Sequence, residues 1–389
     1  MKKIVVLGGT GGIGSVVVKD LFSTRRDCEI IIGASNEKKA KEYAKSFNSK
    51  RVRGIGVDVN NIDQTAKILK GADVCINCVV YYLNLQVMRA CLKSSVHYLD
   101  LGGLFHMTRK QLKLNKQFKK NKLIAVLGCG STPGITNVMA EYSARFFDKI
   151  NEIHISFGDA DFTKYNQPFV LPYTMYTLFD EFMMKPALFT KGKLLMVEPM
   201  SGEKLLKFPK PVGKASGLYT LHSELATFPS SFKNKGIKEC SFRVTFSEDF
   251  RNKIKFLIES GFASEKDMKF GGCENKPKHI TAKIMDQWLP KKETKINDLE
   301  YVRVEIIGKI NGKRKMMILD CLTKSHKKWN IPAGTYDTAV PPSIIAQMMI
   351  NNKIKQYGVL PPEKCINPEL FFKELRKRNI KIFKKIESL

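Results

Sequence analysis

A glycine-rich turn directly behind an apolar segment, at the very start of the chain, constrains the fold more than any other feature. Residues 4–7 are apolar, and residues 8–14 read Gly-Gly-Thr-Gly-Gly-Ile-Gly, which contains the pattern G-x-G-x-x-G. Such a turn between a first strand and a helix brings backbone N–H groups up to a pyrophosphate at the positive end of the helix. We expect six residues to contact a dinucleotide here: Gly9, Thr10, Gly11, Gly12, Ile13 and Gly14.

The alternative is a flexible glycine loop with no ligand. A helix-like stretch over 15–22 and a strand-like stretch over 29–32 complete a βαβ unit around the turn, and this context favours dinucleotide binding. Strand and helix patterns alternate over the first 127 residues, with strands expected at 3–7, 29–32, 52–57, 74–77, 98–101 and 123–127, and helices at 37–47 and 62–70. The prediction is an α/β domain, a doubly wound parallel sheet of the Rossmann type, over residues 1–133.

The pattern changes after Pro133-Gly134. A helix is expected over 135–147, followed by strands at 153–157, 217–221, 237–246, 301–310 and 313–323. Asn311-Gly312 between the last two strands predicts a hairpin, because Asn-Gly suits a tight type I′ turn. We therefore expect an α+β domain with a largely antiparallel sheet over 134–335, which carries substrate contacts and a subunit interface.

The tail over 336–389 is expected to be helical, with helices at 343–351 and 368–378 and a short apolar alternation at 380–383. Helices without strands of their own must bury an apolar face elsewhere. We expect this tail to pack back on the Rossmann domain.

Charge is the most unusual bulk property. The 389 residues include 66 lysines and arginines against 37 acidic residues, which gives a formal net charge of +29. The basic residues are spread along the whole chain, and no nucleic-acid-binding module accompanies them. We therefore predict a solvated lysine-rich surface that attracts an anionic cofactor and carboxylate substrates, with no specific nucleic-acid partner.

Neither a run of eighteen apolar residues nor a secretory signal pattern occurs, so we expect a cytoplasmic protein with no membrane partner. The nine cysteines are odd in number and scattered, which predicts reduced thiols in the core. Cys75 and Cys78 form a C-x-x-C pattern inside a buried strand pattern, where residues three apart point to opposite faces. No metal site is expected.

The segment after the second strand bears on the choice between NADP and NAD. An NAD-binding fold places an acidic residue near the end of this strand, but the first acid here is Glu37, which we expect in the first turn of the next helix. NADP is favoured and NAD remains open, with Ser35, Asn36 and Lys38 as candidates to hold a 2′-phosphate. Asp58 and Val59, just past the third strand, are expected at the adenine end, although Asp58 equally suits a turn that ends the strand.

Four segments resemble the saccharopine dehydrogenase family, near the branch that contains lysine ε-dehydrogenases. They are 73–78 with Tyr82-Leu83-Asn84, 96–103 (Val-His-Tyr-Leu-Asp-Leu-Gly-Gly), 128–137 (Gly-Cys-Gly-Ser-Thr-Pro-Gly-Ile-Thr-Asn) and 357–363 (Tyr-Gly-Val-Leu-Pro-Pro-Glu). The resemblance implies hydride transfer at a carbon that bears nitrogen, with imine formation or hydrolysis, and a homodimer through the second domain. The substrate stays open, because family members act on saccharopine, on lysine and on carboxylated polyamines.

Several residues are candidates for this chemistry. Asp100 ends the fifth strand, at the edge that faces the ligand in open α/β sheets, and is expected to orient a substrate ammonium or take its proton; bonding to the neighbouring glycine turn is the alternative. His222 is the candidate proton shuttle, against a purely structural histidine. Tyr82 is expected to donate to a substrate or cofactor oxygen, or to pack over the cofactor.

The remaining candidates lie in loops that follow strands. Asn77, Cys78, Val79 and Gly102 are expected to contact the cofactor near the nicotinamide ribose. The N–H groups of the loop before the helix at 135 are expected to bind a substrate carboxylate or the nicotinamide amide, or else the loop is only an interdomain hinge. The substrate-binding candidates are therefore Gly103, Pro133 and Gly134. A protein that senses a dinucleotide without catalysis remains the alternative to an enzyme.

Overall fold

The computed structural model describes residues 1–166, 169–291 and 293–389. Its first sheet has the order β17-β6-β5-β4-β1-β2-β3, and every neighbouring pair is parallel. The six predicted strands are confirmed as β1 (Lys2–Leu7), β2 (Cys28–Ala34), β3 (Val52–Gly56), β4 (Val74–Asn77), β5 (His97–Asp100) and β6 (Ile124–Val126). The sheet is doubly wound, as the alternating pattern predicts.

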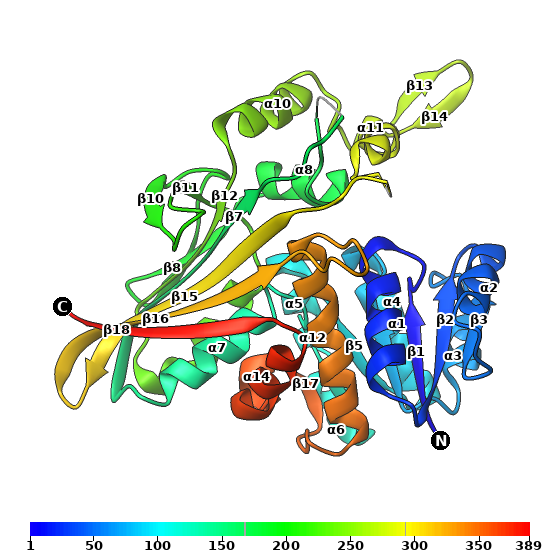
Figure 1. Ribbon diagram of the computed structural model, residues 1–389, viewed down its shortest axis with the longest axis horizontal. Coiled ribbons are helices and arrows are strands. Elements are labelled where there is room, and N and C mark those ends of the chain that lie inside the picture. Colours follow the sequence, from blue (N-terminus) through cyan, green and yellow to red (C-terminus); the bar gives the residue numbers. More distant parts are fainter. Residues whose placement is uncertain (167–168, 292) are drawn as a thin grey trace.

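Helices cover both faces of this sheet (Figure 1). They are α1 (Gly12–Thr24), α2 (Glu37–Lys45), α3 (Ile62–Leu69), α4 (Asn84–Ser94), α5 (Leu104–Leu112) and α6 (Asn115–Lys120), with the short 3₁₀ helix η1 (Tyr81–Leu83) after β4. Alternate residues of β1 pack into two separate cores, Ile4 and Val6 into one and Val5 and Leu7 into the other. A strand that is buried on both faces reads as a continuous apolar run, which explains the sequence pattern.

The second sheet is mostly antiparallel, as predicted, and runs in the order β10-β11-β12-β7-β15-β16-β18, with β8 and β9 attached beside β12. Its strands are β7 (Lys149–Asp161), β8 (Ala187–Thr190), β9 (Lys193–Met196), β10 (Lys204–Lys207), β11 (Lys214–Tyr219), β12 (Glu239–Thr245), β15 (Asp298–Ile310), β16 (Lys313–Lys324) and β18 (Lys381–Ser388). Asn311 and Gly312 turn between β15 and β16 with positive φ angles, which confirms the predicted hairpin.

The tail differs from the prediction, because it contributes a strand to each sheet. β17 (Gly358–Leu360) pairs with β6, and β18 pairs with β16. β17 has three residues, too few to show a strand pattern, and β18 is a mostly exposed edge strand that carries lysines. The tail helices are α12 (Ala333–Ile350), α13 (Pro362–Cys365) and α14 (Pro368–Lys377).

α12 and α7 (Ile135–Ala144) lie between the two sheets and join them into one core (Figure 1). Asp20 on α1 forms a bidentate ion pair with Arg378 and also accepts a hydrogen bond from Ser343 of α12. The pair is almost fully buried, with side-chain exposures of 2% and 5%. The two ends of the chain are therefore fixed to each other inside the protein.

A third layer lies above the carboxyl ends of the first sheet (Figure 1). It consists of α8 (Met175–Met183), α10 (Glu248–Glu259), α11 (Pro277–Met285) and the hairpin of β13 (Met268–Phe270) and β14 (Cys273–Asn275). These helices share a small hydrophobic core of their own around Leu178 and Phe179. No described helix has the length and apolar character that crossing a bilayer requires.

Candidate active site

The glycine turn has the shape that a pyrophosphate requires. Side chains at Gly8, Gly9 and Gly14 would collide with backbone atoms 2.2–2.9 Å away, whereas nothing lies within 4 Å of the position of a Cβ on Gly12. The N–H groups of Gly12 and Ile13, at the start of α1, donate to no described residue. Open space next to unpaired N–H groups at a helix N-terminus fits an anionic cofactor. Gly9 differs, because its N–H donates to the carbonyl oxygen of Gly33.

Ser35 directly follows β2 and Lys38 lies in the first turn of α2, and both are exposed. Glu37 begins α2 and pairs with Lys41, in the first turn of the helix as expected. The Asn36 side chain accepts a hydrogen bond from the N–H of Lys39 and so caps α2. The cap uses only the side-chain oxygen, so the Nδ2 donors that a phosphate requires are not used by it.

Asp58 also has a structural partner, because its side chain accepts hydrogen bonds from the backbone and side chain of Asn60. This is the turn that the alternative interpretation predicts, although Asp58 stays exposed beside the partly buried Val59.

The end of β4 lies against the glycine turn. A Cβ on Gly8 would come within 2.7 Å of the carbonyl oxygen of Cys78, and Cys78 and Val79 are both partly exposed at this point. Asn77 is buried and donates to Asn84 and to the Tyr98 hydroxyl. Cys78 and Val79 thus adjoin the predicted cofactor site directly, whereas Asn77 is buried behind them and stabilises the end of β4 through its hydrogen bonds.

Asp100 is placed differently from the expectation. Its side chain is fully buried and accepts hydrogen bonds from the N–H groups of Gly102 and Gly128, the Tyr98 hydroxyl and the Gln111 amide. Burial raises the pKa of Asp100, and these donors oppose the rise. A carboxylate with this many internal donors ties together the ends of β5 and β6 and does not reach a substrate.

The loop before α7 is likewise occupied by internal contacts. The N–H of Gly134 donates to the Asn137 side chain, and the N–H of Ile135 donates to the carbonyl oxygen of Gly130. Pro133 packs against Gly102 and Gly128, since a Cβ on either glycine would lie within 3.1 Å of its ring. The donors expected for a substrate carboxylate at the N-terminus of α7 are therefore used within the loop.

His222 lies where the second domain meets this loop. Its neighbour Ser223 accepts hydrogen bonds from the N–H of Gly103 and the hydroxyl of Thr108, both in the first domain. The ring of His222 stacks on Phe242 at 3.7 Å between centroids, and its Nδ1 is bonded to the Glu224 carboxylate. Nε2 bonds to no described residue, and 10% of the side chain is exposed. An oriented imidazole with one free nitrogen can exchange a proton.

Two acids near His222 went unnoticed in the sequence. Glu224 is fully buried and also accepts a hydrogen bond from the Thr136 hydroxyl, and the spacing His-x-Glu is the local signal that could have found it. Burial raises the pKa of Glu181 to about 7, while the Tyr173 hydroxyl and the nearby His222 lower it. Glu181 comes from α8, so only the tertiary fold brings it here.

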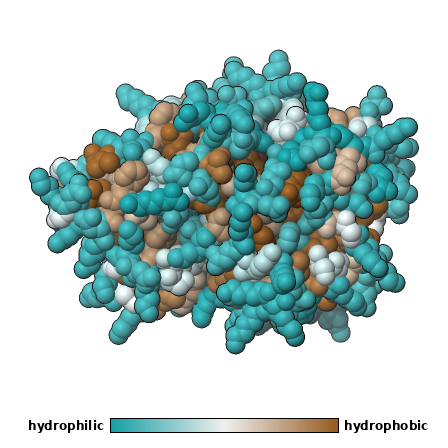
Figure 2. Space-filling model, turned by 90° about the horizontal axis from the view of Figure 1, so that it is seen from below, coloured by the Kyte–Doolittle hydropathy of each residue, from teal (hydrophilic) through white to brown (hydrophobic). Residues whose placement is uncertain are grey.

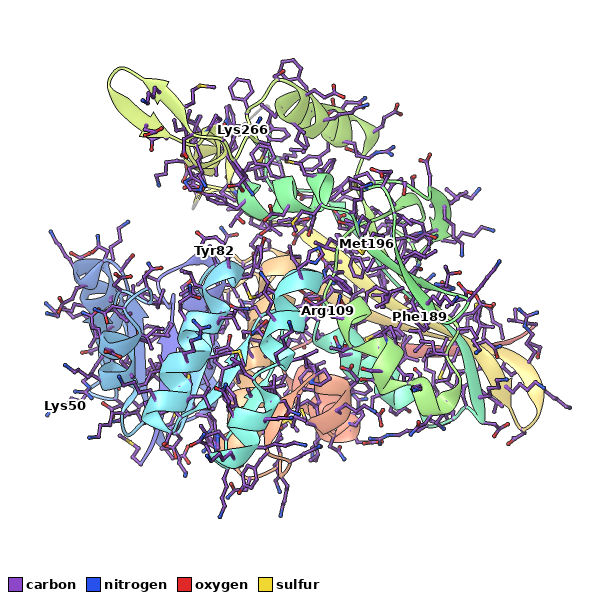
Figure 3. All side chains as sticks on the ribbon, turned by 180° about the vertical axis from the view of Figure 1, so that it is seen from behind. Lys50, Tyr82, Arg109, Phe189, Met196 and Lys266 are labelled. Atoms are coloured by element: carbon purple, nitrogen blue, oxygen red, sulfur yellow. The ribbon has the colours of Figure 1, made fainter. Side chains whose placement is uncertain are left out.

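Tyr82 lies on η1, beneath α8, and half of it is exposed (Figure 3). The adjacent Tyr81 donates a hydrogen bond to Asp180 of α8, and Asp180 also accepts one from Lys278 of α11. Tyr82 thus remains available at the carboxyl edge, and Tyr81 connects the first domain to the layer above it.

Other expectations concern the surface and the thiols. The face in Figure 2 is mostly hydrophilic, which agrees with a solvated lysine-rich surface. The cysteines whose side chains the structure describes are free thiols, and no described group of His, Cys, Asp or Glu has a metal-binding arrangement.

Two family models match consecutive parts of the chain. The model of the saccharopine dehydrogenase NADP binding domain matches residues 4–126, and that of the saccharopine dehydrogenase C-terminal domain matches residues 130–380. A carboxyaminopropylagmatine dehydrogenase from Synechocystis sp. is 25% identical, with 96% of this chain and 95% of the relative covered. A carboxynorspermidine synthase from Vibrio cholerae is 23% identical, with 94% and 93% covered.

The fold is also that of a solved enzyme. A saccharopine dehydrogenase (L-Glu forming) from Saccharomyces cerevisiae superposes with a TM-score of 0.77 at 14% identity, over 100% of both chains. The two matched domain models span nearly all of the chain, and they join a dinucleotide-binding half to a substrate half. The chain therefore belongs to the saccharopine dehydrogenase family and is an NADP- or NAD-dependent oxidoreductase that acts on a carbon–nitrogen bond of an amine or amino acid.

Proposed function

We propose that the substrate is a carboxylated polyamine and that NADP is the preferred cofactor. The observation that carries the substrate is similarity along the whole chain to two relatives whose names specify carboxyaminopropylagmatine and carboxynorspermidine. Exposed Ser35 after β2 and exposed Lys38 in the first turn of α2 support NADP, since β2 itself ends without an acid and Glu37 is paired with Lys41. Saccharopine and lysine remain the competing substrates.

In this proposal the cofactor lies along the glycine turn and the ends of β2 and β4. Gly12, Ile13 and the start of α1 hold its pyrophosphate, and Cys78 and Val79 border the nicotinamide half. When bound, the nicotinamide supplies hydride to, or accepts hydride from, the carbon that bears nitrogen. The chain itself supplies orientation and proton transfer.

His222 handles the proton in this reaction. In the oxidative direction Nε2 takes the proton from the substrate nitrogen as the C–H bond breaks and an imine forms; water then adds to the imine carbon, and the C–N bond breaks to give a carbonyl and an amine. Glu224 is the positioning residue, because its bond to Nδ1 orients the ring and leaves Nε2 as the nitrogen that exchanges the proton. In this assignment four of the candidate residues have a structural role and do not contact the substrate: Asp100, Gly103, Pro133 and Gly134. Tyr82 contacts substrate or cofactor from η1.

The test is a steady-state assay of NADPH oxidation and NADP reduction with purified protein. Carboxynorspermidine and carboxyaminopropylagmatine are compared with saccharopine and lysine, each in the presence of NADP(H) and of NAD(H). Turnover of a carboxylated polyamine at a kcat/KM at least tenfold above that of saccharopine supports the proposal. Faster turnover of saccharopine or lysine would refute the substrate assignment, and tight NADPH binding without any turnover would favour a sensor.

A homodimer through the second domain and a cytoplasmic location without nucleic-acid or membrane partners complete the proposal. Among the strands that the structure describes, β9 pairs with β8 alone, and its exposed side chains include Leu194, Leu195 and Met196. An edge strand with exposed apolar residues offers a surface for a second copy. Light scattering coupled to size exclusion tests it: a monomeric wild type, or a dimer unchanged by Leu195→Lys, would reject this interface.

A further inference from the structure

Two pairs of acidic residues oppose each other on one face of the second sheet. Across β7 and β15, Asp161 is the partner of Asp298, and Asp159 is the partner of Glu300. Residues two apart in a strand share a face, so all four carboxylates lie on the same side. Directly opposed like charges destabilise a sheet. This arrangement therefore requires a compensating interaction.

Half of this arrangement is explained within the chain. Asp298 accepts hydrogen bonds from the N–H of Ala333 at the start of α12, and Asp161 accepts them from the N–H of Thr163 and the hydroxyl of Tyr165. By contrast, neither Asp159 nor Glu300 forms an ion pair with any described residue, although the chain has 66 lysines and arginines.

Glu300 reaches from the sheet to α12. Its Oε2 would lie 2.9 Å from a Cβ on Gly334, so a glycine in the first turn of the helix leaves room for the carboxylate. One turn further along α12 is Asp337, whose charge and whose hydrogen bond to the Glu300 carboxyl both help to raise the pKa of Glu300, after burial as the largest cause. Asp159, Glu300 and Asp337 form what we term the acidic face. Of these three residues, Asp159 is exposed, Glu300 is half-buried and Asp337 is buried.

An unpaired polar atom marks the buried end of the acidic face. Oδ1 of Asp337 has no hydrogen-bond partner, although only 1% of the residue is exposed. The buried hydroxyls of Ser131 and Thr323 lie beside this carboxyl and lower its pKa through hydrogen bonding, against the effect of burial. Thr323 is the partner of Glu300 on β16, and Ser131 belongs to the loop after β6. Buried polar atoms without partners are rare and costly, so an external donor is expected here.

The acidic face adjoins the proposed proton-transfer site. The charges of Glu181, Glu300 and Asp159 all act on the Tyr173 phenol, and Glu181 in turn lies close enough to His222 for their charges to interact. A metal ion does not fit, because the described residues contain no group of three ligands in a metal-binding arrangement. An organic cation with several N–H donors suits carboxylates and hydroxyls spread over three elements.

We propose that Asp159, Glu300 and Asp337 bind an ammonium or guanidinium group of the substrate, distal to the carbon–nitrogen bond that reacts. Ser131 and Thr323 accept further N–H donors of the same group. This assignment rests on the proposed function, since it presumes a substrate with at least two nitrogen centres. On this assignment, the acidic face is the part of the site that makes the enzyme bind polyamines in preference to simple amines of the same length.

Calorimetric titration of the protein with bound NADP tests the assignment without requiring turnover. Spermidine and agmatine are the probes, and n-hexylamine is the single-charge comparison. The wild type is expected to bind both probes at least about tenfold more tightly than n-hexylamine, and Glu300→Gln to lose at least about tenfold of that affinity. Asp159→Asn removes an exposed charge and is expected to weaken binding in the same direction even if variants of the buried positions fold poorly.

The matched control is Asp249→Asn on α10, which removes an exposed charge paired with Lys253. This variant is expected to bind the probes as the wild type does, and an unchanged Kd for NADPH shows that each variant is folded. If Glu300→Gln and Asp159→Asn bind spermidine like the control, or if the wild type does not prefer spermidine to n-hexylamine, the assignment is wrong. Normal probe binding without turnover of carboxylated polyamines would instead refute the proposed function alone.

Discussion

Two buried carboxylates of this protein have opposite surroundings. Asp100 at the edge of the first sheet is fully buried, and donors from Tyr98, Gly102, Gln111 and Gly128 satisfy it. Asp337 on α12 is also buried, yet its Oδ1 has no partner. Burial and position at a strand end therefore do not identify a functional acid. The hydrogen-bond donors that reach each oxygen distinguish a structural carboxylate from one that can bind a ligand.

The largest expected effect is on folding, from Asp100→Ala. The substitution leaves several buried donors without an acceptor, and we expect the free energy of unfolding to fall by roughly 4 kcal/mol. Urea denaturation measures it, with the exposed Asp249→Ala as the control that changes little. A variant of normal stability that has lost only kcat would show instead that Asp100 acts on the substrate, and the contrast with Asp337 would disappear.

The second effect is on turnover. His222→Asn removes the free Nε2, and we expect kcat to fall roughly 100-fold, with a smaller fall, roughly tenfold, for Glu224→Gln, which keeps the shape but not the charge. The Kd for NADPH is expected to stay the same in both variants. Stopped-flow measurement of hydride transfer and its pH profile checks this. Equal activity of His222→Asn and wild type would remove the histidine from the mechanism.

The third effect is a pH dependence of stability from Glu181. Burial raises the pKa of Glu181 from 4.5 to about 7, so the folded state holds its proton more tightly than the unfolded state. This contribution is fully present below about pH 4.5 and is lost as the pH rises through 7, about 3 kcal/mol in all. Glu181→Gln should flatten that part of the unfolding profile. An identical pH slope in variant and wild type would contradict this reading.

The smallest expected effect is on NADPH affinity, and it concerns the cofactor-binding half of the protein alone. A Cβ at Gly12 meets nothing in the protein, so Gly12→Ala is expected to leave stability unchanged and to raise the Kd for NADPH roughly tenfold. Gly14→Ala is the comparison, because its Cβ would lie 2.2 Å from the carbonyl oxygen of Gly8 and must disturb the fold as well. Cofactor fluorescence and thermal unfolding measure the two quantities. Unchanged NADPH affinity in Gly12→Ala would move the pyrophosphate elsewhere.

The sequence determined the features that depend on neighbouring residues. The glycine turn, the alternating strands and helices of the first domain and the Asn311-Gly312 hairpin each have a local cause, and the structure confirms them. His222 was identified as a candidate in a similar way, because an imidazole side chain can exchange a proton near neutral pH. The carbon–nitrogen oxidoreductase chemistry was implied by the resemblance of four segments to the saccharopine dehydrogenase family, which the two family models show.

Only the tertiary structure decided what depends on residues far apart in the chain. The hydrogen bonds that make Asp100 structural come from β5, α5 and the loop after β6, and the acidic face combines β7, β15 and α12. The strands β17 and β18 form because each pairs with an edge that the rest of the chain has already built. Local patterns show which residues a segment contains, but the donors, charges and strand edges that surround them are fixed only when the chain folds.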